Sequence, residues 1–191
     1  MEQNFLRYLK LVLAIAFFVT AGILILGWLG NYFVAEITQE VFLPEQQLAE
    51  LKEVVLGKPA PYFDLKNLSG ERFNLSEFKN KNLILTFWTT WNQLAADQIR
   101  IWDEYLRVNK SDFEVRLINS QEDKVLVESF LKRGGYEVPV LVDERGAVTD
   151  SYGARVLPVS YFINKNGTVE LIHVGVLDSK ALIELSLKTF Q

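Results

Sequence analysis

Few side chains in this sequence are suited to nucleophilic, acid–base or metal chemistry. The 191 residues contain no cysteine and a single histidine, His173. Without cysteine, the chain can neither exchange disulfides nor hold a metal through thiolates. A catalytic triad or a histidine-rich metal site would have to use His173, which lies in an apolar run where histidine is usually a packed or edge residue. We therefore expect no metal, no cofactor and no pair of nucleophile and base.

Composition and charge limit the classes of partner. Hydrophobic residues make up 49% of the chain and charged residues 23%, which is typical of a globular protein. The formal net charge is −4, and no run of lysine and arginine interleaved with aromatic residues occurs. A general nucleic-acid binder would carry a basic stripe, so we expect no nucleic-acid partner.

The stretch from residue 11 to 34 contains no charged residue. About 20 helical residues cross a hydrocarbon core of about 30 Å, so this stretch predicts a transmembrane signal anchor. The alternative is a cleaved signal peptide, whose apolar region is shorter and is followed by a small-x-small site. Arg7 and Lys10 precede the stretch, whereas residues 35–56 contain five glutamates and one lysine. This asymmetry predicts a cytoplasmic segment over residues 1–10 and a C-terminal domain outside the cytoplasm.

Residues 35–56 read as a linker. Pro44 can begin a helix and Gly57 can end one, and apolar residues recur between them at helical spacing. A short amphipathic helix is therefore expected in this segment.

From residue 57 to 191, strand-like and helix-like segments alternate, which predicts one α/β domain. A continuous apolar run at 83–88 predicts a central strand that is covered on both faces. We expect a mixed sheet flanked by helices, parallel in its first half, with an N-terminal hairpin extension and an antiparallel hairpin near the end. The expected strands are 62–65, 72–75, 83–88, 113–119, 138–142, 159–164 and 168–174, and the expected helices are 92–108, 122–133, 148–152 and 179–190.

Five segments of this domain resemble the TlpA/ResA-type thioredoxin-like proteins, which are redoxin relatives on the outer side of the bacterial inner membrane. The resemblance implies a thioredoxin-like fold over about residues 57–190, preceded by one transmembrane helix. It also implies a single-pass location in the bacterial cytoplasmic membrane, with the membrane itself as a partner. The segments are 57–65, 68–76, 81–91, 138–143 and 152–164.

The sequence departs from this family at the reactive positions. Family members carry Trp-Cys-x-x-Cys at the start of the first long helix, and the matching stretch here is Trp91-Asn92-Gln93-Leu94-Ala95. Asn92 stands where the nucleophilic cysteine would be, and Ala95 stands where the resolving cysteine would be. An asparagine amide is not a nucleophile, but asparagine is a good N-cap and alanine is the best helix former. We therefore expect no catalytic residue and a retained local structure.

The resemblance further implies a shallow groove between the loop before this helix and a loop with a cis proline at Leu157-Pro158. Such a groove can pair with an extended peptide. The alternative is that the tryptophans are core or rim residues. The expected partner-binding residues are Trp88, Trp91, Asn92, Gln93, Leu157 and Pro158.

Four functions remain open from the sequence. The first is a redox-inactive, membrane-anchored domain that binds a protein of the cell envelope. The second is an accessory role in the family's cytochrome c or disulfide maturation pathways, and the third is a structural subunit of a membrane complex. The fourth is an enzyme of another kind that uses Thr89, Asn92 or Gln93 as polar groups. A cysteine-free variant of an active enzyme is a further alternative.

Overall fold

The computed structural model describes residues 49, 53, 55–109 and 112–190. The chain divides into two compact units, 1–42 and 43–191, and the described residues belong to the second. In that described part, no helix is both long enough and apolar enough to cross a membrane. The predicted span at 11–34 and most of the predicted linker helix lie outside the described residues.

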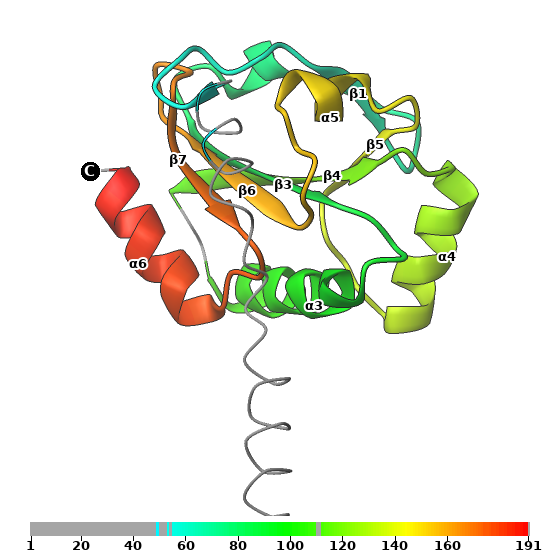
Figure 1. Cartoon of the computed structure of the whole chain (residues 1–191). Helices are drawn as coiled ribbons and strands as arrows, with labels where there is room; N and C mark the ends of the chain where they lie inside the picture. The colour runs from blue at the N-terminus through cyan, green and yellow to red at the C-terminus, as the bar shows by residue number, and fades with distance from the viewer. Residues whose placement is uncertain (1–48, 50–52, 54, 110–111, 191) are drawn as a thin grey trace, which may run out of the picture. The chain divides into compact units, whose positions relative to one another are not determined.

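The domain is built around a seven-stranded mixed sheet with the order β2-β1-β5-β4-β3-β6-β7 (Figure 1). The strands and helices that the sequence predicts from residue 57 onward are present, with shifts of a few residues at their ends. The strands are β1 (Asp64–Asn67), β2 (Arg72–Asn74), β3 (Asn82–Trp88), β4 (Phe113–Ser120), β5 (Val140–Asp143), β6 (Val159–Ile163) and β7 (Val169–Val174). The helices are η1 (Leu75–Phe78), α3 (Gln93–Val108), α4 (Lys124–Gly134), α5 (Ala147–Ser151) and α6 (Ser179–Thr189).

The strand pairing has the predicted mixture of directions. β3, β4 and β5 run parallel to one another, and β6 and β7 continue the sheet antiparallel beyond β3. The β1–β2 hairpin joins the other side through an antiparallel pairing of β1 with β5. The parallel strands β3, β4 and β5 therefore end at one edge of the sheet, where the loops before α3 and α4 begin.

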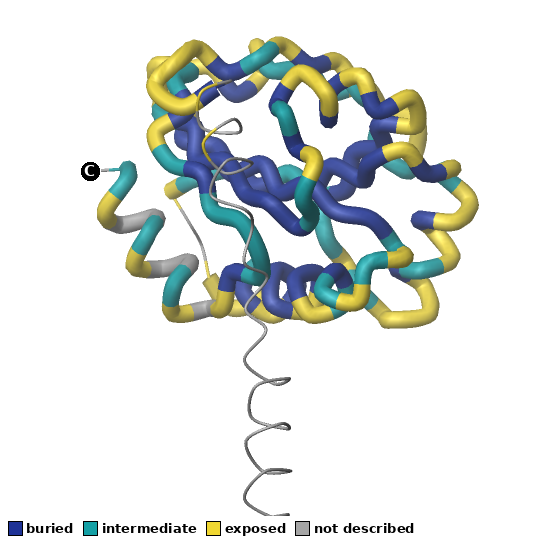
Figure 2. Tube along the Cα trace, in the orientation of Figure 1, coloured by how far each residue is buried: buried dark blue, intermediate teal, exposed yellow. Residues whose placement is uncertain are grey.

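Hydrophobic clusters cover both faces of the sheet. One cluster packs residues of α3, α4 and α6 against the sheet, and the other packs residues of η1 and α5 against the opposite face. Figure 1 shows α3 and α4 on one side of the sheet and α5 on the other. All seven residues of β3 are buried, as Figure 2 shows for the centre of the sheet, because helices cover it from both sides.

Buried polar contacts fix α3 on the sheet. The indole N–H of Trp102 in α3 donates to the Thr86 hydroxyl on β3 over 3.2 Å. That hydroxyl lies 2.8 Å from the Ser160 hydroxyl on β6. A buried hydroxyl without a partner costs free energy, so this chain of bonds favours one position of the helix.

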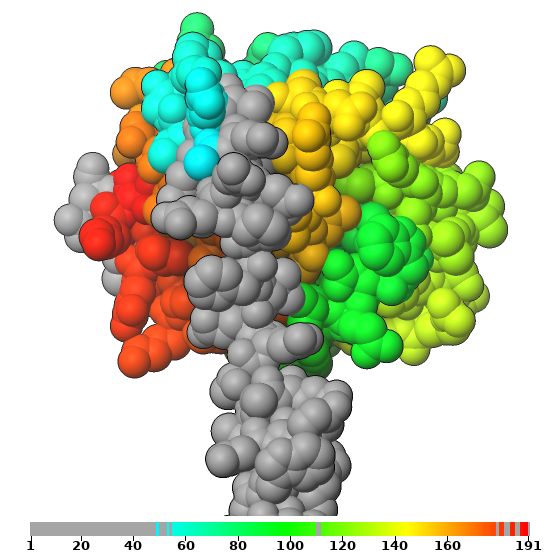
Figure 3. Space-filling view, in the orientation of Figure 1, coloured from blue at the N-terminus to red at the C-terminus, as the bar shows by residue number. Residues whose placement is uncertain are grey.

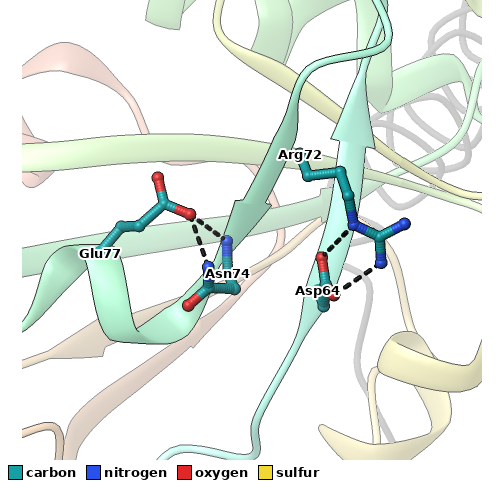
Figure 4. A network of polar contacts seen from close by, with 4 residues as sticks. All are labelled: Asp64, Arg72, Asn74 and Glu77. Atoms are coloured by element: carbon teal, nitrogen blue, oxygen red, sulfur yellow. Dashed lines mark hydrogen bonds and ion pairs between the residues drawn. The ribbon is translucent and has the colours of Figure 1, made fainter.

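Two polar contacts stabilise the β1–β2 hairpin and the turn that follows it (Figure 4). The Arg72 guanidinium donates to both carboxylate oxygens of Asp64, over 3.1 and 2.6 Å, and this contact holds the pKa of Asp64 below its usual value. Asn74 accepts the Ser76 N–H over 3.0 Å, and its own backbone N–H donates to Glu77 over 2.8 Å. The second pair forms a capping box at the start of η1.

The capping box and the ion pair should differ in their contribution to stability. We expect Asn74→Ala to lower the free energy of unfolding by about 1 kcal/mol, because it removes the side-chain acceptor of the Ser76 N–H. Arg72→Ala should change it little, because exposed ion pairs are screened by water. Urea unfolding of both variants checks this, and an equal loss in the two would contradict it.

Candidate functional site

Strand pairing brings the two loops of the predicted groove together. The first loop follows β3 and carries Thr89, Thr90 and Trp91, and the second is Leu157-Pro158, directly before β6. Because Phe87 on β3 pairs with Val159 on β6, the end of β3 meets the start of β6. The Leu157-Pro158 peptide bond is cis, as the family resemblance implied. In Figure 3 the green surface at the start of α3 lies between the gold loop before β6 and the yellow-green α4.

Asn92 links these two loops through both ends of its side-chain amide. Its Oδ1 accepts the backbone N–H of Leu94 over 2.8 Å, which makes Asn92 the N-cap of α3 as predicted. Its Nδ2 donates to the carbonyl oxygen of Leu157 over 2.7 Å. The position of the family's nucleophile is therefore occupied by a group that joins the helix to the cis-proline loop.

The other family position, Ala95, is fully buried in the cluster between α3 and the sheet. One turn further along α3, buried Gln98 accepts the N–H of Leu177 over 2.7 Å. This bond ties α3 to the segment that follows β7. Ala95 and Gln98 thus contribute packing and backbone contacts.

Glu122 fixes the loop before α3 from the opposite side. Its buried carboxylate accepts the Thr90 N–H and the Thr90 hydroxyl, each over 2.6 Å, and the Asn119 side-chain amide over 2.7 Å. The sequence reasoning missed Glu122. A signal existed, since Glu122 lies two residues after the end of β4, which is parallel to β3 and ends at the same edge of the sheet.

Two of the predicted binding residues belong to the interior. Trp88 is fully buried and packs against Phe130 of α4, with 5.4 Å between ring centroids, because it faces the α3–α4 side of a strand covered on both faces. Pro158 is also buried, and its carbonyl accepts the Gly175 N–H over 2.8 Å. Neither side chain offers surface to a partner, so the assignment of Trp88 and Pro158 to a partner contact is corrected.

The remaining predicted residues reach the surface in one region. Trp91 is 73% exposed, Gln93 is also exposed, and Asn92 and Leu157 are partly buried. The bonds from Glu122 to Thr90 bring the start of α4 to the same end of the sheet. There α4 adds the exposed apolar side chains Val125 and Leu126, which the sequence reasoning did not include. We call Trp91, Gln93, Val125 and Leu126 the α3–α4 face.

His173 lies apart from this face. It sits on β7 opposite Ser160, is partly buried, and its Nε2 lies 3.3 Å from the carbonyl oxygen of Val176. Burial lowers the pKa of His173, opposed by the Val176 carbonyl and by Asp178. Its contacts match the packed role that the sequence predicts, rather than that of a catalytic base.

The arrangement supports positioning and binding better than catalysis. Thr89 is buried, the amide of Asn92 is used at both ends, and the carboxylate of Glu122 already accepts three donors. Within the described ranges, no cluster of three or more histidine, aspartate or glutamate side chains could hold a metal.

Known proteins resemble this chain in sequence and in fold. Residues 56–172 match the sequence pattern of the AhpC/TSA family. The thiol-disulfide oxidoreductase ResA of Geobacillus thermodenitrificans is 33% identical over 129 residues, which cover 67% of this chain and 74% of the relative. ResA of Bacillus subtilis is 30% identical over 142 residues, covering 74% of this chain and 76% of that protein.

Solved structures give the same fold. The exposed lipoprotein thioredoxin Etrx1 of Streptococcus pneumoniae matches with a TM-score of 0.58 and 26% identity, covering 67% of this chain and 99% of that one. StoA of Bacillus subtilis matches with a TM-score of 0.60 and 23% identity, covering 66% and 97%. The thioredoxin-like fold predicted from the sequence is confirmed.

The two bonds of Asn92 lead to a prediction about charge. Asn92→Asp keeps an acceptor for the Leu94 N–H but places a carboxylate oxygen against the Leu157 carbonyl. We expect it to lower the free energy of unfolding by about 1–2 kcal/mol at pH 7, although an acid at a helix N-terminus is otherwise favourable. The deficit should shrink as pH falls and the carboxyl protonates, because the protonated group can donate again.

Asp123 supplies the matched control, because it caps α4 through a single bond to the Val125 N–H over 2.7 Å. Asp123→Asn should leave stability within about 0.5 kcal/mol of wild type, since both residues are good caps. Urea unfolding from pH 4 to pH 7 measures both variants. An Asn92→Asp protein as stable as wild type at pH 7 would refute the two-bond interpretation.

Proposed function

The chain belongs to the AhpC/TSA family, and from this membership we propose that it is a membrane-anchored, redox-inactive relative of ResA that acts by binding a protein of the cell envelope. The observation that carries the proposal is the Asn92 amide at the nucleophile's position, bonded to Leu94 and Leu157. It keeps the two loops of the site in place without any group that could attack a disulfide.

The absence of thiol chemistry follows from residue types. Family catalysis needs a thiolate at the N-terminus of a helix and a second thiol to resolve the mixed disulfide. Asn92 and Ala95 occupy these two places, and the chain has no cysteine elsewhere. Relatives named as thiol-disulfide oxidoreductases therefore indicate common ancestry, while this chain needs another activity.

The α3–α4 face supports binding. Trp91, Val125 and Leu126 are exposed at the same end of the sheet, and exposed aromatic and apolar side chains are what protein partners often bury. The loop that carries Trp91 is held by Asn92 on one side and by the contact of Glu122 with Thr90 on the other. A surface that is already ordered loses less conformational entropy on binding.

The same bonds favour side-chain recognition over backbone pairing. An extended peptide that adds to a loop or strand edge needs free N–H and C=O groups. The carbonyl of Leu157 is already used by Asn92, so the cis-proline loop offers a peptide less than a free loop would. We propose that the partner packs on Trp91, Val125 and Leu126.

Membrane anchoring completes the proposal and rests on the sequence. The uncharged stretch at 11–34 and the basic residues before it support a single span with the domain outside the cytoplasm. In that location the α3–α4 face would meet envelope proteins.

Site-specific photocrosslinking in native cells tests the binding face. A photoreactive amino acid at Gln93 should yield a crosslinked product of defined mass. The same amino acid at Val108 should not, although Val108 is 82% exposed at the far end of α3. Adding Trp91→Ala to the Gln93 probe should reduce the product at least about fivefold, since tryptophan contacts dominate many interfaces. Equal products from positions 93 and 108 would contradict the proposal.

Restoring the thiols tests the scaffold separately. The double variant Asn92→Cys, Ala95→Cys should gain dithiol-dependent insulin reduction, because its first cysteine would lie at the N-terminus of α3. The wild-type protein should give the same rate of insulin reduction as a blank without protein. Reduction by purified wild type would refute redox inactivity, and an inactive, folded double variant would show that the site has changed beyond these two positions.

A further inference from the structure

A hollow of about 420 Å³ lies at the end of the sheet opposite Asn92, between η1, the start of β3 and the β6–β7 turn. Its floor is apolar and includes Phe78, Leu83 and Ile163, and its rim carries Lys79, Lys81 and Lys165. A second hollow of about 160 Å³ adjoins it and shares Lys81 and Lys165. We call the larger one the lysine hollow.

The charge of the lysine hollow is opposite to that of the chain. Three lysines and no carboxylate line it, whereas the whole chain has a formal net charge of −4. Lys81 forms an ion pair with Glu114 over 3.0 Å. Lys79 and Lys165 are exposed and take part in no ion pair in the part of the chain that the structure describes. Two ammonium groups at its rim therefore remain available to an anion.

The chain enters the domain beside this hollow. The Gly57 N–H donates to the Val169 carbonyl and the Ala60 N–H donates to the Gly167 carbonyl, each over 2.8 Å. In Figure 1 the cyan segment and the β6–β7 turn lie together at the upper left, away from the start of α3. The residues that follow the proposed membrane span and its linker thus run along the turn that carries Lys165.

We infer that the lysine hollow binds the phosphate groups of anionic lipids on the membrane surface that anchors the chain. The inference rests on the membrane anchoring in the proposed function. Lysine ammonium groups attract anionic headgroups, and the attraction decreases with salt. The anchor keeps the domain close to the bilayer, so weak individual contacts act at high effective concentration.

This contact would orient the α3–α4 face. β3 runs from Asn82 and Leu83, which line the smaller hollow and the lysine hollow respectively, to Trp88 at the site end. Seven residues of strand span about 20 Å. A domain that rests on the membrane through Lys79 and Lys165 therefore presents Trp91 about 20 Å further out, toward envelope proteins.

Lysine footprinting of the full chain in nanodiscs tests the inference. Acetylation of Lys79 and Lys165 is compared in discs of phosphatidylcholine and in discs with half phosphatidylglycerol. We expect at least a threefold decrease in the anionic discs that is abolished in 1 M salt, where screening acts within about 3 Å. Lys124 and Lys132 on α4, which are also accessible, serve as internal controls and should not change.

Each alternative result of the footprinting experiment overturns a different part of the inference. Equal acetylation of Lys79 in both discs overturns the lipid site. Protection by glycerol 3-phosphate in phosphatidylcholine discs, without protection by phosphatidylglycerol, overturns it in favour of a soluble anion. Loss of the protein from both kinds of disc overturns the anchor on which the inference rests, and it leaves the crosslinking test of the α3–α4 face unaffected.

A dye at Asn166→Cys, the only thiol in such a variant, gives a second measurement. Quenchers attached to lipid headgroups in anionic discs should quench this dye. The quenching should fall at least twofold when the double substitution Lys79→Gln, Lys165→Gln is added. The control double substitution Lys124→Gln, Lys132→Gln should leave the quenching of the dye unchanged. Equal quenching in both pairs would contradict the lipid site.

Discussion

The two-sided bond of Asn92 is the constraint on which the rest of the site depends. An asparagine amide carries a donor and an acceptor on one short side chain, which a cysteine thiol cannot match. Here the acceptor caps α3 and the donor reaches the Leu157 carbonyl, so one residue fixes a helix end and the cis-proline loop together. The thioredoxin-like architecture therefore stays intact at the position where the family keeps its reaction.

Contacts on other sides of α3 make that constraint effective. Glu122 holds the loop before the helix through Thr90, and Gln98 ties the helix to Leu177. Trp102 adds a bond to the sheet below. An exposed tryptophan on a loop held in this way loses little conformational freedom when a partner covers it, which supports the proposed function in binding.

Local signals predicted most of the fold, while long-range contacts decided the site. The buried run of β3, the antiparallel hairpin near the end of the chain and the cap at Asn92 follow from residue type and spacing, and all three appear. The bond from Asn92 to Leu157 joins residues 65 positions apart, and no local pattern encodes it. Trp88 was misassigned because β3 is buried on both faces. Its sequence therefore lacks the alternation of apolar and polar residues that would distinguish a side chain of the interior from one of the groove. The membrane span and the envelope partner stay predictions from the sequence and the family.

Hydrogen exchange of side-chain amides, followed by NMR on the full-length protein, tests the central claim most directly. If the Asn92 amide joins α3 to the cis-proline loop, its Nδ2 protons should exchange at least about tenfold more slowly than those of Asn166, whose side chain is exposed. Exchange of Asn92 at the rate of Asn166 would mean that the amide is free. In that case the site is not held in the way on which the proposed function depends.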